Sequence, residues 1–162
     1  MNSNEIKILI DQFGISNFLG VFAIDELKEI SENSNGVLIF NTDPSYKSGQ
    51  HWIATCICNQ DIFYFDPLAE IENSPTEILS FAKRQKKNFT YNNIRVQSYD
   101  SSSCGLHCLV FCYVMSKRPV FTIYKRYLKS FLSCKSTEER EKLSISYFSI
   151  INKRKSTHKK QE

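Results

Sequence analysis

The sequence predicts a single α+β domain in which a central mixed or antiparallel β-sheet is flanked by helices. Two apolar runs, residues 51–58 and 62–66, are joined by a very short polar turn and give the clearest hairpin signal in the chain. Residues 4–13 carry apolar side chains at helical spacing. Residues 104–115 are strongly apolar, which predicts a buried helix.

The first half of the chain supplies most of the strands. Residues 18–22 form a short apolar segment, and residues 37–40 (Val-Leu-Ile-Phe) predict a buried strand. The polar stretch 41–50 contains a proline and a glycine and predicts a loop before the hairpin. Because loops of this kind frequently line functional sites, residues 43–50 are a candidate substrate rim; an ordinary surface loop is the alternative.

A capped helix and one further strand are expected next. Ser74 is a suitable N-cap and Pro75 suits the first helical position. Glu77 completes a capping box, so a helix should run to about Lys87. Residues 94–99 predict a strand that ends at a polar loop just before the buried helix.

Two more helices complete the predicted domain. Residues 122–133 place aromatic and aliphatic side chains on one face, which we expect in the core. Ser136 begins a capping pattern for a last helix that ends at about Ile151. The sequence shows no internal repeat and no linker. Residues 1–151 are therefore predicted to be one domain, and residues 152–162 a basic, disordered tail.

Composition narrows the class of protein. The chain has 162 residues, 41% hydrophobic and 13% aromatic, which fits a soluble globular domain. No apolar run approaches the ~18 residues of a membrane-spanning helix, so no membrane partner is expected. The start lacks the basic and small-residue features of a signal peptide, so we expect a protein that is not secreted. In a reducing compartment its six cysteines should be mostly free thiols.

Positive charge is gathered in two places, although the formal net charge is only +4. One cluster falls near the end of the predicted middle helix and the other in the tail. The side chains are Lys83, Arg84, Lys86 and Lys87, and then Lys153, Arg154 and Lys155. They are either a solvated helix face with a disordered end, or a contact for a polyanion, for which nucleic acid is the obvious candidate.

Cys104 is the candidate nucleophile. It follows Asp-Ser-Ser-Ser at 100–103, all suitable N-cap residues, and it opens the buried helix. The unpaired N–H groups and the dipole at a helix N-terminus favour an anion there. Such surroundings, especially beside a protonated histidine, lower the pKa of a cysteine thiol from ~8.5 into roughly the 3.5–7.5 range.

His51 and Asp66 are the candidate base and its orienting acid. His51 begins the first strand of the hairpin and Asp66 ends the second. If Asn59 and Gln60 form a two-residue turn, the pair lies diagonally on one face, roughly 7–8 Å apart at Cα. A three-residue turn puts His51 on the other face unless a bulge restores the register. In the first register Asp66 accepts the His51 Nδ1–H and leaves Nε2 as the base.

Gln97 and the backbone N–H of Cys104 are the candidate oxyanion donors. Gln97 ends a predicted strand seven residues before Cys104. Donors of this kind are worth roughly 2.7–4 kcal/mol each. Gly105 leaves room for a substrate backbone, and Trp52 is placed to shield the base from water. The predicted substrate rim consists of Gln50, Trp52, Ser103 and Gly105.

The same residues are also compatible with purely structural roles. Cys104 fits a buried thiol, and His51 fits a structural histidine. His107 is expected to be structural, because it lies on the wrong side of the helix turn to serve as the base. A zinc site is a further alternative, but apolar neighbours favour core packing of Cys108 and Cys112 and no metal is predicted. The residues that invite the zinc site are Cys104, Cys108, Cys112, His107, Cys56 and Cys58.

Several motifs occur in a specific order along the chain. The order is histidine, acid, glutamine, cysteine, with a seven-residue step from Gln97 to Cys104. The segments concerned are residues 18–20, 41–42, 51–54, 63–67, 97 and 103–108. Together they resemble adenain-like, adenovirus-type cysteine proteases and their relatives in virophages and self-synthesising DNA transposons. These proteases in turn resemble the ubiquitin-like-protein proteases of clan CE, and the likeness covers about residues 5–120.

The resemblance implies a fold and a set of roles. The fold is the circularly permuted papain-like arrangement of adenain, with the nucleophile at the N-terminus of a buried helix. Cys104 attacks, His51 transfers the proton, Asp66 orients His51, and Gln97 stabilises the oxyanion. Adenain has a glutamate as its third member, so an aspartate at position 66 looks more like the ubiquitin-like-protein branch.

The resemblance also implies substrates and partners. Proteases of this family mature viral capsid and core precursor proteins, often cutting after glycine, so we expect such substrates in the virion and the host-cell interior. Adenain is stimulated by DNA and by a viral peptide; both are expected activators, although the chemistry requires no cofactor. Two alternatives stand beside this function. They are a ubiquitin-like-protein (SUMO-type) isopeptidase and a catalytically silent DNA- or capsid-binding protein.

Overall fold

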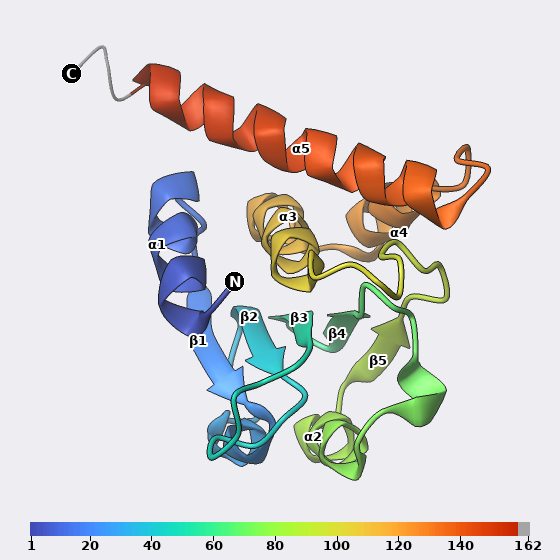
Figure 1. Cartoon of the computed structure of the whole chain (residues 1–162). Helices are drawn as coiled ribbons and strands as arrows, with labels where there is room; N and C mark the ends of the chain where they lie inside the picture. Colours follow the sequence, from blue (N-terminus) through green and yellow to red (C-terminus); the bar gives the residue numbers. More distant parts are fainter. Residues whose placement is uncertain (159–162) are drawn as a thin grey trace.

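The computed structural model describes residues 1–158, which contain a mixed five-stranded sheet between layers of helices (Figure 1). The strands lie side by side in sequence order: β1 (Phe18–Ala23), β2 (Gly36–Asn41), β3 (Trp52–Cys58), β4 (Asp61–Phe65) and β5 (Asn88–Tyr91). The central strands β2, β3 and β4 are antiparallel, whereas each edge strand is parallel to its neighbour. The predicted α+β class with a central mixed sheet is confirmed.

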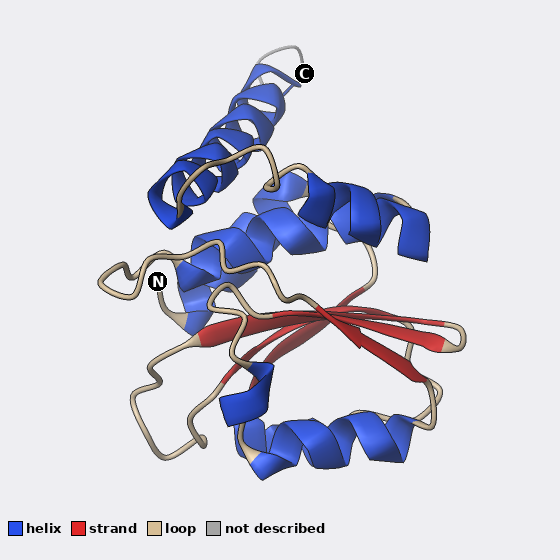
Figure 2. Cartoon of the chain, turned by 90° about the vertical axis from the view of Figure 1, so that its right-hand side faces the viewer, coloured by secondary structure: helices blue, strands red, loops and turns tan. Residues whose placement is uncertain are grey.

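Helices cover both faces of the sheet (Figure 2). One face carries α1 (Ser3–Phe13), α3 (Cys104–Lys117) and α4 (Phe121–Lys129), with α5 (Thr137–His158) outside α3. The other face carries α2 (Thr76–Gln85) and the short 3₁₀ helices η1 (Ile24–Glu29) and η2 (Ile71–Asn73). Because both faces of the central strands are buried, these strands are continuous apolar runs in the sequence. None of the helices within residues 1–158 has the length and apolarity that crossing a bilayer takes.

The β3–β4 hairpin adopts the two-residue turn. Cys58 pairs directly with Asp61, and Asn59 between them has a φ of 52°, a left-handed conformation that asparagine adopts more readily than most residues. Continuation of this pairing places Asp66 diagonally opposite His51 on the same face. This register is the one that the predicted catalytic pair requires.

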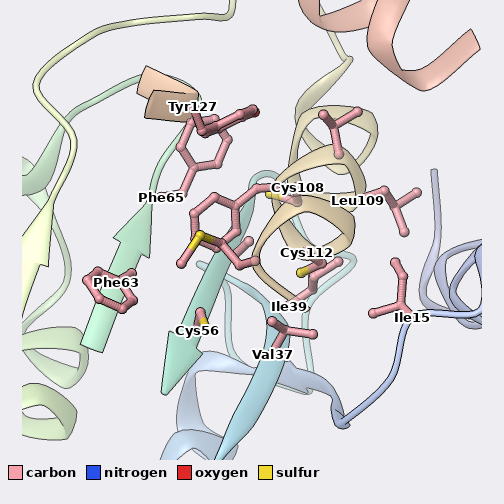
Figure 3. Close-up of a cluster of buried hydrophobic side chains, with 14 of the residues drawn as sticks. Ile15, Val37, Ile39, Cys56, Phe63, Phe65, Cys108, Leu109, Cys112 and Tyr127 are labelled. Atoms are coloured by element: carbon pink, nitrogen blue, oxygen red, sulfur yellow. The ribbon is translucent and has the colours of Figure 1, made fainter. Parts of the chain in front are cut away.

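The larger core lies between the sheet and α3 (Figure 3). Cys108 and Cys112 are fully buried in it, so the prediction that these thiols pack in the core is confirmed. Phe65 stacks on Phe111 with ring centroids 5.1 Å apart. Burial of large apolar side chains contributes roughly 1.5–3 kcal/mol each. This packing holds the first turn of α3 against the sheet.

One predicted strand is wrong. Residues 94–99 do not pair with the sheet, because the N–H groups of Val96 and Gln97 both donate to the carbonyl oxygen of Pro67, at 2.9 and 3.0 Å. The strand beside β4 is instead β5, which was not predicted from the sequence. Its sequence, Asn-Phe-Thr-Tyr, alternates polar and aromatic side chains, but four residues are the shortest run that signals a strand.

The predicted cap of α2 is also wrong. The Ser74 hydroxyl donates to the carbonyl oxygen of Glu70 at 3.3 Å, and α2 begins without a side-chain cap. The helix ends at Gln85 rather than near Lys87, because Lys86 has a left-handed φ of 52°.

The C-terminal helices agree with the sequence in kind but differ in length. α4 ends at Lys129 rather than at residue 133, where the Ser130 hydroxyl satisfies the carbonyl oxygen of Tyr127 at 2.6 Å. Ser136 caps α5 as predicted and accepts the Glu139 N–H at 3.2 Å. Of the predicted tail, residues 152–158 continue α5 and residues 159–162 lie outside the described residues. The boundary at residue 151 stays a prediction.

Candidate active site

The start of β3, the end of β4 and the start of α3 meet at one edge of the sheet. They bring the predicted catalytic residues together. His51 directly precedes β3, Asp66 directly follows β4, and Cys104 is the first residue of α3. The His51 Nε2 lies 2.7 Å from the Asp66 Oδ1. One turn beyond Cys104, the Cys108 thiol donates to the carbonyl oxygen of Trp52 at 3.3 Å and ties α3 to the start of β3.

The loop before His51 is held by the buried side chain of Asn41. Its Oδ1 accepts the N–H groups of Asp43 at 2.9 Å and Gln50 at 3.2 Å. Gly49 has a φ of +79°, and a Cβ there would lie 2.6 Å from the Asn41 amide nitrogen, so this position requires glycine. These contacts of Asn41 fix the backbone that directly precedes His51.

Asp66 is almost fully buried, with 3% of its surface exposed, yet every oxygen of its carboxylate has a partner. Besides His51, it accepts the backbone N–H of Leu68 at 2.8 Å and of Glu70 at 3.0 Å. Asn92 holds its main chain: the Asp66 N–H donates to Asn92 Oδ1 at 2.9 Å, and Asn92 Nδ2 donates to the Asp66 carbonyl oxygen at 2.7 Å. Asp66 is therefore rigidly placed as the orienting acid.

Cys104 and His51 form a hydrogen-bonded thiolate–imidazolium pair. Burial opposes charge on His51, but hydrogen bonds to Asp66 and Cys104 raise the pKa of its imidazole to about 9. Burial likewise opposes the Cys104 thiolate, but hydrogen bonds from His51 and the Trp52 backbone lower the pKa of this thiol below its usual value. Both shifts favour the charged forms, so the arrangement favours a thiolate beside an imidazolium.

The two nitrogens of His51 have exchanged the roles expected from the sequence. The expectation was that Nδ1 faces Asp66 and that Nε2 transfers the proton. In the structure Nε2 faces Asp66, which leaves Nδ1 for the Cys104 thiol. The side-chain rotamer of His51 sets which nitrogen reaches the acid, and the sequence does not contain that information.

Gln97 is buried, and its side-chain amide is fixed next to the nucleophile loop. Its Nε2 donates to the carbonyl oxygen of Ser101 at 2.7 Å, which leaves the second N–H of the amide to serve an oxyanion. Its backbone N–H binds Pro67, the residue after Asp66. The first free N–H groups of α3 are those of Cys104 and Gly105, because the Leu106 N–H already donates to the Ser103 carbonyl oxygen at 3.0 Å.

The predicted rim residues have different surroundings. Trp52 and the buried Gly105 lie against Met1: the Trp52 Nε1 donates to the Met1 carbonyl oxygen at 3.0 Å, and a Cβ on Gly105 would lie 3.0 Å from the Met1 sulfur. Gln50 is exposed. Ser103 binds interior side chains through its hydroxyl, so that group is not directed to a rim.

A polar cleft adjoins the site on the Trp52 side. It has a volume of 380 Å³ and lies between the N-terminal segment, β1 and the loop that was predicted as the substrate rim. Its lining includes Trp52, Glu26, Asp43 and Lys47. A cleft of this position and polarity can hold an extended peptide next to the nucleophile.

The predicted basic residues do not form one surface. Lys83 and Arg84 belong to α2 on one side of the sheet, and Lys153 belongs to α5 on the other (Figure 1). Arg84 donates to the Leu27 carbonyl oxygen at 2.5 Å, and the Lys86 ammonium lies 3.3 Å from the Glu32 carboxylate. The remaining candidates are Lys87, which is half-buried, Arg154, and Lys155, whose side chain lies outside the described part of the chain.

Sequence reasoning missed two residues that support the site. Asn92 gives no signal because an asparagine after a short strand is typical of a turn. Glu141 is on α5, 37 residues after Cys104, yet it binds the loop that precedes the nucleophile. No local pattern identifies a contact between segments so far apart. His107, expected to be structural, is fully buried and hydrogen-bonded on both ring nitrogens.

Comparison with known proteins agrees with this geometry. No protein-family model matches the chain. The protease of snake adenovirus serotype 1 is 26% identical over 133 residues, which cover 73% of this chain and 66% of that protein. The chain is therefore similar in sequence to an adenovirus protease. It spans a little under two thirds of the length of this relative.

Two solved structures share the fold of this chain. ChlaDub1 from Chlamydia trachomatis has a TM-score of 0.52 and 16% identity, covering 94% of this chain and 80% of that chain. The Chlamydia trachomatis effector protein Cdu1, solved bound to ubiquitin, has a TM-score of 0.51 and 19% identity, covering 94% of this chain and 78% of that chain. The predicted resemblance to adenain-like proteases of clan CE is confirmed.

Proposed function

We propose that the protein is a cysteine endopeptidase that cleaves viral or mobile-element structural precursor proteins during virion maturation. The observation that carries the proposal is the hydrogen-bonded series Asp66, His51 and Cys104. It lies at the edge of the sheet where β3 begins, β4 ends and α3 begins. A charged thiol held by a protonated imidazole serves acyl transfer and has no role in packing. The homology to an adenovirus protease favours a protein substrate of viral type.

The first half of the reaction forms an acyl-enzyme. The Cys104 thiolate attacks the scissile carbonyl carbon, a C–S bond forms, and the carbonyl oxygen becomes an oxyanion. Gln97 Nε2 and the backbone N–H of Cys104 donate to that oxygen. His51 Nδ1–H then protonates the leaving amine, the C–N bond breaks, and a thioester remains on Cys104.

The second half restores the resting pair. Water attacks the thioester carbon while His51, now neutral, takes one proton from it. The second tetrahedral oxyanion uses the same donors. Collapse breaks the C–S bond, releases the carboxylic acid and returns the thiolate beside the imidazolium. Asp66 keeps the ring oriented through both halves.

Incubation with the structural precursor proteins of the same genome tests the proposal. The expected result is a set of new N-termini, read by mass spectrometry, that appear with the wild type and not with Cys104→Ala. A Cys104→Ala variant that folds normally and still produces these termini would contradict the assignment of the nucleophile. Parallel incubations with DNA and with short viral peptides test the proposed activators.

Ubiquitin-like-protein isopeptidase activity is the second candidate function. Two observations favour it: the third member is an aspartate, and the fold is shared with Cdu1, a protein solved bound to ubiquitin. Electrophilic ubiquitin and SUMO probes distinguish the two functions. Covalent capture at Cys104 by such a probe, without cleavage of viral precursors, would select the isopeptidase.

A further inference from the structure

A second cluster of buried polar side chains lies beside the loop that ends at Cys104. His107 Nε2 is 2.8 Å from the Ser103 hydroxyl, and His107 Nδ1 is 2.7 Å from the hydroxyl of Ser144 on α5. The Ser103 hydroxyl also donates to a carboxylate oxygen of Glu141. None of these groups belongs to the Cys104–His51–Asp66 line.

The charge of Glu141 fixes the direction of every bond in the cluster. Burial favours its neutral form, but hydrogen bonds from three loop serines lower the pKa of the carboxyl to about 2, so it is a pure acceptor. The single proton of Ser103 therefore goes to Glu141, and Ser103 must accept from His107 Nε2–H. His107 Nδ1 then accepts the Ser144 hydroxyl proton. Burial lowers the pKa of His107 to about 4, which is consistent with this neutral tautomer.

The Glu141 carboxylate holds both ends of the loop between the oxyanion donor and the nucleophile. One oxygen binds the hydroxyl of Ser103, the residue before Cys104. The other accepts the backbone N–H of Ser98, the residue after Gln97, at 3.4 Å. A single side chain from α5 thus sets the spacing between Gln97 and Cys104.

The Ser103 hydroxyl binds Glu141 instead of capping α3. Ser103 is the N-cap residue of α3, a position where a serine normally accepts an N–H of the first turn. Here the side chain makes no capping bond. The Leu106 and His107 N–H groups donate to the Ser103 carbonyl oxygen. The N–H groups of Cys104 and Gly105 therefore remain for an anion, while the loop gains its anchor on α5.

We propose that Glu141 is a positioning residue of the active site, whose carboxylate holds residues 98–103 so that the oxyanion donors are preformed next to Cys104. The role rests on the proposed acyl-transfer function. It predicts that the loss of Glu141 weakens oxyanion stabilisation while the Cys104–His51 pair stays intact, because His51 and Asp66 are held by β3, β4 and Asn92 rather than by α5.

Two reactions of Cys104 separate this role from a merely structural one. Peptide cleavage uses the oxyanion donors, whereas alkylation by iodoacetamide uses only the thiolate. We expect Glu141→Ala to lower kcat ~10–100-fold, the effect of a misplaced or missing oxyanion donor. KM and the alkylation rate of Cys104 should stay within about threefold of wild type. Glu141→Gln, which keeps one acceptor oxygen, should recover part of kcat.

Ile151→Ala is the matched control. Ile151 is buried on the same helix, ten residues or ~15 Å further along, and supports the core rather than the loop. It should lower the melting temperature while kcat remains at the wild-type value. Hydrogen exchange gives a readout independent of activity: amides of residues 98–103 should exchange faster in Glu141→Ala and normally in Ile151→Ala.

The outcomes distinguish the positioning role from the proposed function. Wild-type kcat in Glu141→Ala, a parallel fall of kcat and alkylation rate, or unchanged exchange of the loop would each overturn the role of Glu141. A further outcome is that the wild type cleaves no precursor while the amides of residues 98–103 exchange faster in Glu141→Ala. In that case the proposed function fails, but Glu141 still holds residues 98–103.

Discussion

At the scale of single residues, the site is a compromise between burial and charge. Cys104 is only 6% exposed, an environment that by itself keeps a thiol neutral. The His51 ring reverses that preference, and Asp66 in turn holds His51 protonated. The reactivity of Cys104 therefore depends on a side chain that does not touch it.

Asp66→Asn tests that dependence. The amide keeps the size of the side chain but removes the charge that holds the pKa of His51 at about 9, so this pKa should fall toward 6.5. Since the active form needs the imidazolium, the alkaline limb of the pH–activity profile should move to lower pH. The maximal kcat should fall about 10²-fold or more, as for loss of positioned proton transfer. An alkaline limb that stays near pH 9 would contradict the role of Asp66.

The candidate catalytic residues could be identified from residue type and spacing, and the structure brings His51, Asp66 and Cys104 together. A cysteine at a helix start, a histidine and an acid at the ends of one hairpin, and Gln97 before the loop are local patterns. The choice between the two His51 nitrogens was not predictable, because it depends on the side-chain rotamer and on the approach of α3 to β3. The contact of Met1 with Gly105 was also not predictable, because it depends on how the N-terminal segment packs against α3.

At the scale of elements, short connections hold the catalytic groups more than regular structure does. The hairpin register was left between two alternatives by the sequence, and the left-handed Asn59 selects one of them. The failed strand at residues 94–99 has a physical cause: Pro67 takes two of its N–H groups. That contact joins the Asp66 end of β4 to Gln97. The segment that does not form a strand therefore holds Gln97 beside Asp66.

Asn92→Ala tests the support of Asp66 by its neighbouring segment. Both side-chain bonds to the Asp66 main chain would be lost in a buried position, which should cost about 1–3 kcal/mol in the free energy of unfolding. The value of kcat should fall as well, because Asp66 loses its fixed position. Asn93→Ala, at the exposed neighbouring residue, is the control. Equal stability of the two variants in urea would show that Asn92 has no such role.

At the scale of the whole molecule, the sheet separates two cores, and the active site is attached to the larger one. α5 lies outside α3 (Figure 2). Its polar side chains contact the nucleophile loop and His107. The layers were predictable, because apolar periodicity identifies the helices and the four strands β1 to β4, although it does not identify β5. The contact of α5 with the nucleophile loop was not, because Glu141 and Ser144 resemble ordinary helix-surface residues in the sequence.

His107 makes global stability sensitive to acid. Its pKa is about 4 when folded and 6.5 in the reference state, so between these values the unfolded chain binds the extra proton. Stability should therefore rise with pH across this window, and about 2–3 kcal/mol should be lost as the pH falls from 6.5 to 4. His51 is protonated in both states over most of this window and contributes little. Urea unfolding should show a flatter pH dependence for His107→Gln; identical slopes would exclude His107 as the source.

The pH dependence of Cys104 alkylation is a direct test of the claim that His51 lowers the pKa of the Cys104 thiol. Iodoacetamide modification at Cys104, followed by mass spectrometry, measures the thiolate without any substrate. The claim predicts that Cys104 reacts ahead of the other five thiols, with a midpoint below the reference value of 9.0, and that His51→Ala moves the midpoint up toward that value. A midpoint at the ordinary thiol pKa, unchanged in His51→Ala, would contradict it.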